Sequence, residues 1–228
     1  MIFVTGDTHG KFERLEEFAY SNALTRDDYV IVAGDFGFLW KPEFRLEKLR
    51  RLSELPYTLL FVDGNHENYD LLESYSIEEW KGGKVHRLTD NVIHLMRGQI
   101  FDIDGRRILA FGGAESTDKC MRRLGISVWE QEEITQSDVD EAQRNLDKCG
   151  GRVDYVISHS CSADLKQFNY HVFKRYNVEL RMYSEQPFIG MVENYLNYYR
   201  QWYFGHFHFD SDVDGKHTAV YEKFIPLD

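Results

Sequence analysis

In the first third of the chain, short continuous runs of apolar residues alternate with stretches in which apolar residues have helical spacing. The runs at residues 2–4, 29–32 and 59–62 have the length of buried β-strands. Between them, apolar side chains recur every third residue over 12–18 and again over 46–52, the spacing of a helix that buries one face. The pattern therefore predicts a β-α-β-α-β order and a fold of the α/β class.

The middle of the chain has the pattern of hairpins. Apolar runs near residue 85 and at 92–93, 100–103 and 108–111 are separated by turn residues. Among these turns, Asp104-Gly105 has the sequence of a two-residue hairpin turn. We therefore expect antiparallel strands in this part of the molecule.

The last part of the chain returns to helices and strands after a polar stretch. Residues 114–135 show no regular pattern, and we expect a loop or insert there. Ser137 is then expected to cap a helix, and the run at 155–157 to form a strand. An amphipathic stretch, the apolar run at 202–204 and the turn pair Asp214-Gly215 predict one more helix, one more strand and a closing hairpin.

Length, charge and cysteine content narrow the class of protein. The 228 residues fit one domain, which we place at 1–228. Lys and Arg number 27 against 38 Asp and Glu, and the net charge of −11 opposes attraction to nucleic acid or to an anionic membrane. The three cysteines show no paired spacing, which indicates a reducing compartment. With no basic, apolar leader and no run of ~18 apolar residues, we expect a cytoplasmic protein.

Polar side chains that bind metals follow five of the predicted strands. They are Asp7 and His9, Asp35, Asn65 and His66, His159, and His206 and His208. Functional groups gather where the carboxyl ends of strands meet their loops, so these side chains are expected to share one site. Carboxylate, amide and imidazole together suit divalent Mn, Fe or Zn. Glycines beside them, including Gly34, Gly64 and Gly205, are expected to permit the bends that aim them.

The order of these motifs carries a family resemblance. From Gly6 to His208 the chain contains GD-x-HG, GD, GNHE, H and GH-x-H, each after an apolar run. This series resembles the calcineurin-like metallophosphoesterase family. The resemblance implies a four-layer α/β/β/α sandwich of two mixed sheets, with a metal site at the C-terminal edge of the strands. It also implies hydrolysis of a phosphate ester.

The same resemblance assigns a role to each motif residue. Asp7, His9 and His208 would hold one divalent ion, Asn65, His159 and His206 a second, and Asp35 would bridge both. A hydroxide shared by two ions ~3.5–4 Å apart would attack phosphorus in line. His66 would then protonate the leaving oxygen as a general acid.

The sequence departs from the phosphoprotein phosphatases of this superfamily. Those relatives carry two phosphate-binding arginines in their motifs, and both are absent here. They also place an Asp, which orients the acid histidine, where this chain has Phe38. Arg122 and Arg123 in the polar insert are candidates to bind the substrate phosphate, or else they are solvated surface side chains.

Several other polar residues match no catalytic motif. Glu67 is expected to be a solvated carboxylate or a partner to a metal ligand. Cys161 is expected to be a packing residue, since no triad partner accompanies it. We expect surface or structural roles for the remaining histidines, which are His86, His94, His171 and His217.

These observations favour a hydrolase of a small phosphomonoester or phosphodiester. A nuclease of the same superfamily is an alternative, although such nucleases add a capping domain for which this chain has little room. A second alternative is a catalytically idle binding scaffold of the same fold, but here every ligand position is filled. A small phosphate ester is the expected partner, while a membrane and nucleic acid are not. The oligomeric state stays open.

Overall fold

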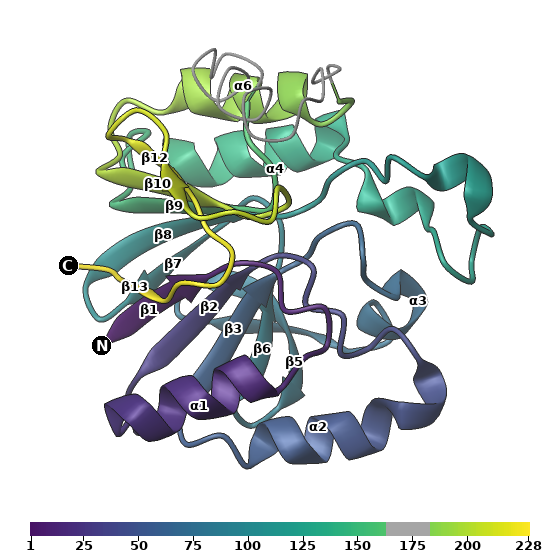
Figure 1. Cartoon of the computed structure of the whole chain (residues 1–228). Helices are drawn as coiled ribbons and strands as arrows, with labels where there is room; N and C mark the ends of the chain where they lie inside the picture. The colour runs from purple at the N-terminus through teal and green to yellow at the C-terminus, as the bar shows by residue number, and fades with distance from the viewer. Residues whose placement is uncertain (163–182) are drawn as a thin grey trace.

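Two mixed β-sheets face each other, and each carries helices on its outer side (Figure 1). The computed structural model describes residues 1–162 and 183–228. In the first sheet the strand order is β13-β1-β2-β3-β6-β5-β4, and in the second it is β11-β12-β10-β9-β8-β7. The four-layer α/β/β/α sandwich predicted from the sequence is therefore confirmed.

The strands of the first sheet come mostly from the first half of the chain. They are β1 Ile2–Thr5, β2 Tyr29–Ala33, β3 Thr58–Val62, β4 Ile77–Trp80, β5 Gly83–Thr89, β6 Val92–Leu95 and β13 Ile225–Pro226. The second sheet contains β7 Gln99–Ile103, β8 Arg106–Phe111, β9 Tyr155–Ser158, β10 Gln201–Phe204, β11 Ser211–Asp212 and β12 His217–Ala219. The predicted β-α-β-α-β start and the later hairpins are confirmed.

Helices cover both outer faces of the sandwich. They are α1 Glu13–Asn22, α2 Arg45–Ser53, α3 Tyr69–Leu72, α4 Gln136–Asp147 and α6 Gln186–Tyr195. The prediction that Ser137 caps α4 was wrong, because Thr135 is the N-cap and forms a capping box with Asp138. Among the described residues, no helix has the length and apolar content that a membrane crossing requires.

The core lies in three layers because both faces of the central strands are buried. In β3, Leu59 packs with the residues of α1 and α2, while its neighbour Leu60 faces the second sheet. In β9, Val156 packs with α4 and α6, while Ile157 faces the first sheet. Alternate residues of a strand point to opposite faces, so burial on both sides produces the unbroken apolar runs seen in the sequence.

The local sequence explains the turn between β7 and β8, but it does not explain the edge strand β4. Asp104 and Gly105 join β7 to β8 with φ of 50° and 75°, as a type I′ turn requires. The irregular stretch 114–135 forms two short 3₁₀ helices, Lys119–Met121 and Glu130–Glu132. Strand β4 was not predicted, since three of its four residues are exposed and it shows no apolar run.

The parallel strands end together at one edge of the sandwich. Strands β1, β2 and β3 are parallel neighbours, with Thr5 paired to Val32 and Ala33 to Val62. Strands β9 and β10 are also parallel, with Phe204 paired to Ser158. The loops that follow all five strands therefore start side by side, which brings the predicted ligands to one place.

Candidate metal centre

Four of the predicted metal ligands meet at this edge. Ligand atoms of Asp7, His9, Asp35 and His208 all lie within 4.8 Å of one another. The Nε2 atoms of His9 and His208 are 2.9 Å apart, and Asp7 Oδ2 lies 3.0 Å from His208 Nε2. Asp7 Oδ2 is buried and lacks hydrogen-bond geometry to any described residue. Lone pairs that converge in this way fit a divalent cation.

A second group of predicted ligands lies on the other side of Asp35. His159 Nε2 lies 3.1 Å from Asn65 Oδ1 and 3.3 Å from Asp35 Oδ1. His159 Nδ1 donates to the Ala33 carbonyl at 2.9 Å, so in neutral His159 the Nε2 lone pair faces these oxygens. On the opposite side, Asp35 Oδ2 lies 3.9 Å from His9 Nε2. Each oxygen of Asp35 therefore faces a different ligand group.

His206 completes the second group from the loop after β10. Its ring lies 5.0 Å from the ring of His159, and its backbone N–H donates to Asp7 Oδ1 at 3.0 Å. Burial, and then the neighbouring His159, lower the pKa of His206 to about 4. The ring is therefore neutral near pH 7, as a metal ligand must be.

The carboxylates give the site a negative field. Burial alone would lower the pKa of His159, but the Asp35 carboxylate raises it to about 10. Conversely, although burial raises the pKa of Asp35, His159 holds it well below its usual range. A field that stabilises a proton between these groups also stabilises a metal cation there.

Four predicted ligands have a backbone conformation that side chains rarely adopt. The φ angles of His9, Asp35, His206 and His208 are 46°, 46°, 68° and 53°. The left-handed region costs a non-glycine residue about 1–2 kcal/mol, and such strain clusters at functional sites. The expectation that neighbouring glycines permit the bends did not include this strain in the ligands themselves.

Neighbouring glycines allow the ligands to pack closely. A Cβ atom on Gly64 would lie 2.3 Å from Asp35 Oδ1. A Cβ atom on Gly205 would lie 2.3 Å from Asp7 Oδ1. Both distances are shorter than any allowed contact, so these positions need glycine for space and not for a left-handed turn.

His66 lies beside the ligands. Its backbone N–H donates to Asp35 Oδ1 at 2.8 Å, and its ring lies 5.7 Å from that of Trp40. Phe38, at the position of the missing Asp, is buried in the core. Burial, and to a smaller extent Arg122, lower the pKa of His66, although Asp35 opposes them.

The two candidate arginines differ in position. Arg122 Nη1 lies 3.4 Å from His66 Nδ1, and Nη2 lies 3.2 Å from His66 Nε2, so the guanidinium covers the imidazole. Arg122 Nε also pairs with Asp118 Oδ1 at 2.7 Å, and its side chain is 13% exposed. Arg123 is exposed. The structure therefore brings Arg122, and not Arg123, to the predicted site.

Glu67 contacts the backbone that follows the proposed ligand Asp35. It is buried, so of its two expected roles, a solvated carboxylate or a partner to a metal ligand, the first was wrong. The backbone amides of Phe36 and Gly37 donate to its carboxylate at 2.6 and 3.3 Å. Burial raises the pKa of Glu67 well above its usual value, and these two amides oppose the shift. Glu67 thus holds the backbone that follows Asp35.

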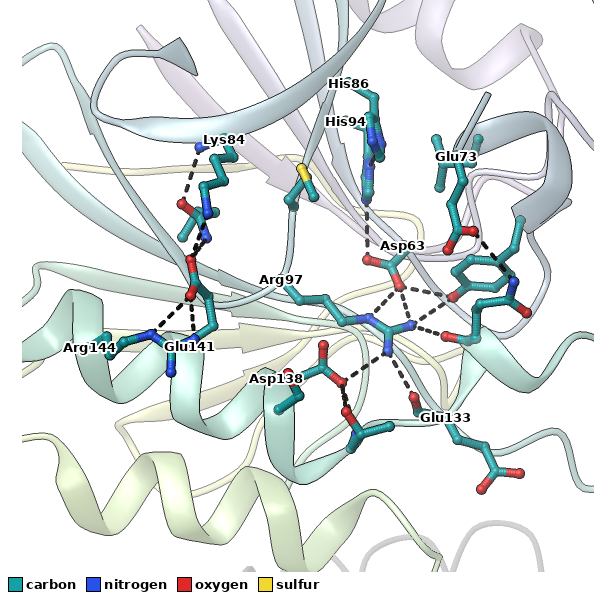
Figure 2. A pocket seen from close by; sticks show the side chains of 17 residues that line it. Asp63, Glu73, Lys84, His86, His94, Arg97, Glu133, Asp138, Glu141 and Arg144 are labelled. Carbon is teal, nitrogen blue, oxygen red and sulfur yellow. Dashed lines mark hydrogen bonds and ion pairs between the residues drawn. The ribbon is translucent and has the colours of Figure 1, made fainter. Parts of the chain in front are cut away.

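A polar pocket is lined by Asp63 and Tyr69, which flank the loop that carries Asn65 and His66. It has a volume of about 400 Å³, and Asp63 and Arg97 meet in it (Figure 2). His94 Nε2 lies 3.2 Å from Asp63 Oδ1, and the ring of His94 stacks on that of His86. Both histidines are buried.

The remaining residues that match no motif are buried or lie outside the described residues. His217 and Cys161 are buried, which agrees with structural roles. The histidines at 86 and 94 have structural roles as well, because they support Asp63. The prediction for His171 lies outside the described residues.

Comparison with known proteins identifies one family. The family model of the calcineurin-like phosphoesterases matches residues 1–210. Among curated proteins, no sequence matches the chain.

Solved structures give two distant likenesses. One is a protein of unknown function, AQ665, from Aquifex aeolicus, with 18% identity and a TM-score of 0.35, over 86% of this chain and 93% of that one. The other is the sulfate thiohydrolase SoxB of Thermus thermophilus in complex with glycerol, with 11% identity and a TM-score of 0.40. That match covers 94% of this chain and 36% of SoxB.

Proposed function

The chain belongs to the calcineurin-like phosphoesterase family, and we propose that it hydrolyses a small phosphomonoester or phosphodiester with two divalent metal ions. The observation that carries the proposal is the position of Asp35. Its Oδ1 faces His159 and its Oδ2 faces His9, so one carboxylate serves both ligand groups.

The donor set fits two ions of the Mn, Fe or Zn class. One ion would be held by Asp7, His9, His208 and Asp35, and the other by Asn65, His159, His206 and Asp35. When bound, such a pair activates water as a nucleophile and neutralises charge on the phosphoryl oxygens.

The chain's own residues supply the other parts of the reaction. A ring nitrogen of His66 would protonate the leaving oxygen, because this side chain lies next to the ligands without belonging to either group. Arg122 would bind phosphate oxygens, since its guanidinium lies at His66 and a guanidinium fork matches phosphate geometry. An anionic phosphate beside Arg122 would also offset the effect of that cation on the pKa of His66.

Metal content and turnover test this function together. Protein reconstituted with Mn²⁺ is expected to bind two ions and to hydrolyse nitrophenyl phosphate or bis(nitrophenyl) phosphate. Asp35→Ala should weaken both sites, because it removes one ligand from each. Asp102→Ala, which removes an exposed carboxylate in the β7–β8 hairpin, should change neither measurement. One ion or none at saturation, or no turnover of either ester, would refute the proposal.

A further inference from the structure

The segment that follows the family match returns to the proposed metal centre. The match ends at residue 210, and the loop 220–224 lies between β12 and β13. β13 then pairs antiparallel with β1, the strand that leads to the first ligand motif (Figure 1). The Gly6 amide donates to the Tyr221 carbonyl at 3.1 Å. A Cβ atom on Gly6 would lie 2.1 Å from the Val220 carbonyl oxygen, so this close approach of two backbones requires glycine.

Arg14, in the first turn of α1, joins this loop to the backbone of a proposed ligand. Its Nη2 donates to the Gly6 carbonyl at 2.6 Å and to the Asp7 carbonyl at 3.2 Å. Its Nη1 donates to the Tyr221 carbonyl. A guanidinium is planar and holds its donors in a fixed fork, so it sets the spacing of the acceptors around it. Arg14 thus fixes the backbone of Asp7 relative to that of Tyr221.

The side chain of Tyr221 contacts a second ligand of the same ion. Its ring stacks on that of His208, with centroids 4.9 Å apart and an angle of 27° between the planes. The side chain of His208 is 49% exposed, so the stacked ring restrains an imidazole that the core does not enclose. The Asp210 carboxylate accepts from the amides of Tyr221 and Glu222 at 2.8 and 3.1 Å. These bonds hold the Tyr221 backbone against the loop that carries His208.

The two contacts meet at one ion of the proposed pair. Asp7 Oδ2 lies 3.0 Å from His208 Nε2, and both residues belong to the group whose ligand atoms lie within 4.8 Å of one another. The charge of Arg14 would by itself oppose a cation there, so its removal would tighten metal binding. A loss of metal affinity in a folded Arg14 variant therefore indicates lost positioning and not lost charge.

We propose that Arg14 and Tyr221 are positioning residues that hold Asp7 and His208 in the geometry of the first metal ion. This inference rests on the proposed two-metal function. Arg14 lies outside the motifs on which the ligands were recognised, and Tyr221 lies beyond the family match. Loss of a side chain that orients a metal ligand typically weakens metal binding by about 10- to 100-fold.

Titration calorimetry with Mn²⁺ on the full chain tests the role of Arg14. Arg14→Met keeps an unbranched aliphatic side chain and removes the donors, so it is expected to weaken one ion by about 10- to 100-fold and the other far less. Arg26→Met is the matched control. Arg26 also donates to two backbone carbonyls, those of Tyr57 and Ser53 at 3.2 and 2.8 Å, but it precedes β2 at the end opposite the metal centre. It should leave both ions unchanged.

Two variants of Tyr221 test the stacked ring. Tyr221→Leu removes the ring and keeps the backbone carbonyl, so it should weaken the same ion that Arg14→Met weakens. Tyr221→Phe keeps the ring and should retain both affinities. Tyr221 is only half-buried, so this pair tests the proposal even if Arg14→Met does not fold.

A variant of the second ligand group identifies the affected ion. Asn65→Ala removes a ligand that belongs to the second ion alone, so the first ion is the one that remains. Adding Arg14→Met to Asn65→Ala should weaken the remaining ion by the same factor as in the wild-type background.

The proposal fails if Arg14→Met binds both ions as tightly as the wild type or more tightly, or if it weakens both equally. It also fails if Tyr221→Leu and Tyr221→Phe have equal affinities, or if Arg14→Met has no effect in the Asn65→Ala background. Wild-type protein that binds fewer than two Mn²⁺ ions would instead refute the proposed function. The two failures are therefore distinguishable.

Discussion

Arg97 and Asp63 form a buried ion pair that joins the loop before Asn65 to the insert. Arg97 Nε donates to Asp63 Oδ2 at 2.7 Å, and the two side chains are 11% and 2% exposed. Arg97 also donates to the carbonyls of Gln131 and Glu133, at 2.7 and 2.9 Å. Burial raises the pKa of Asp63, but Arg97 and His94 outweigh this effect and hold the pKa well below its usual range. One side chain thus connects two segments that flank the proposed site.

Breaking this pair should destabilise the fold. Arg97→Met leaves the Asp63 charge buried without a partner, which is expected to lower the free energy of unfolding by about 3–5 kcal/mol. Urea unfolding measures the change. Arg50→Met removes a helical ion pair with Glu54 whose side chains are 70% and 62% exposed, and it should cost no more than about 0.5 kcal/mol.

A double variant tests whether the unpaired charge of Asp63 causes the loss of stability. Adding Asp63→Asn to Arg97→Met removes the uncompensated charge, so the double variant should be more stable than Arg97→Met alone. A double variant that is less stable than Arg97→Met would show that the hydrogen bonds of Asp63 with Tyr69 and His94 outweigh the cost of its unpaired charge.

The two adjacent arginines of the insert should differ in catalysis. Arg122→Met should lower kcat/KM on a small phosphate ester by about 10- to 100-fold, since a hydrogen bond to a charged group contributes about 1.5–3 kcal/mol. Arg123→Met is the matched control and should change kcat/KM less than about twofold, because its side chain is exposed. Equal effects in steady-state kinetics would argue against a role for Arg122 in phosphate binding.

His66→Ala should retain the metals and lose the general acid. With an alkyl phosphate, whose leaving group needs protonation, the variant should be slower by about 10²–10⁴-fold. A nitrophenolate needs little protonation, so hydrolysis of the nitrophenyl ester should be far less impaired. Rates on both esters and metal content are measured together. A fall in metal content would show that His66 is a ligand and not an acid.

Phosphoserine peptides should be poor substrates relative to small esters. The two arginines that bind phosphate in the related phosphoprotein phosphatases are absent from the motifs. Of the arginines in residues 1–162 and 183–228, only Arg122 lies at His66. Comparison of kcat/KM for a phosphoserine peptide and for a small ester checks this selectivity. Equal values would contradict it.

Buried histidines should give the stability a defined pH dependence. Burial, and then His94, lower the pKa of His86 to about 4. In the unfolded chain the value is about 6.5, so between pH 6.5 and 4 the unfolded state binds more protons. The stability contribution of neutral His86 is complete above pH 6.5 and is lost as the pH falls to 4. His86→Gln should therefore lose less stability than the wild type between pH 7.5 and 5.

His217 should give the stability a pH dependence opposite to that of His86. Burial lowers the pKa of His217, but hydrogen bonds to Glu193 and Asp214 outweigh this effect and raise the pKa above its usual value. Its contribution is complete below pH 6.5 and is lost as the pH rises through the raised folded value. His217→Gln should remove that loss. Unfolding titrations across this pH range that show the same slope for both variants and the wild type would contradict both assignments.

The fold class and the candidate ligands could be predicted from the sequence alone. Strands buried on both faces must be apolar throughout, so the runs in β1, β2 and β3 could be recognised without a structure. The turn at Asp104-Gly105 was also predictable, because its conformation depends on those two residues. The ligand motifs were found because each one follows its strand directly.

Which of the other charged groups lie at the proposed site depends on the folded structure. Arg122 and Arg123 are neighbours with equal charge, and only the folded insert places Arg122 at His66. Glu67 reaches the amide of Phe36 across 31 positions, and Arg97 reaches Asp63 across 34. Such contacts leave no periodic pattern in the chain, because hydrophobic spacing records which face is buried and not which polar groups meet. The left-handed backbone at the ligands is likewise imposed by the surrounding packing.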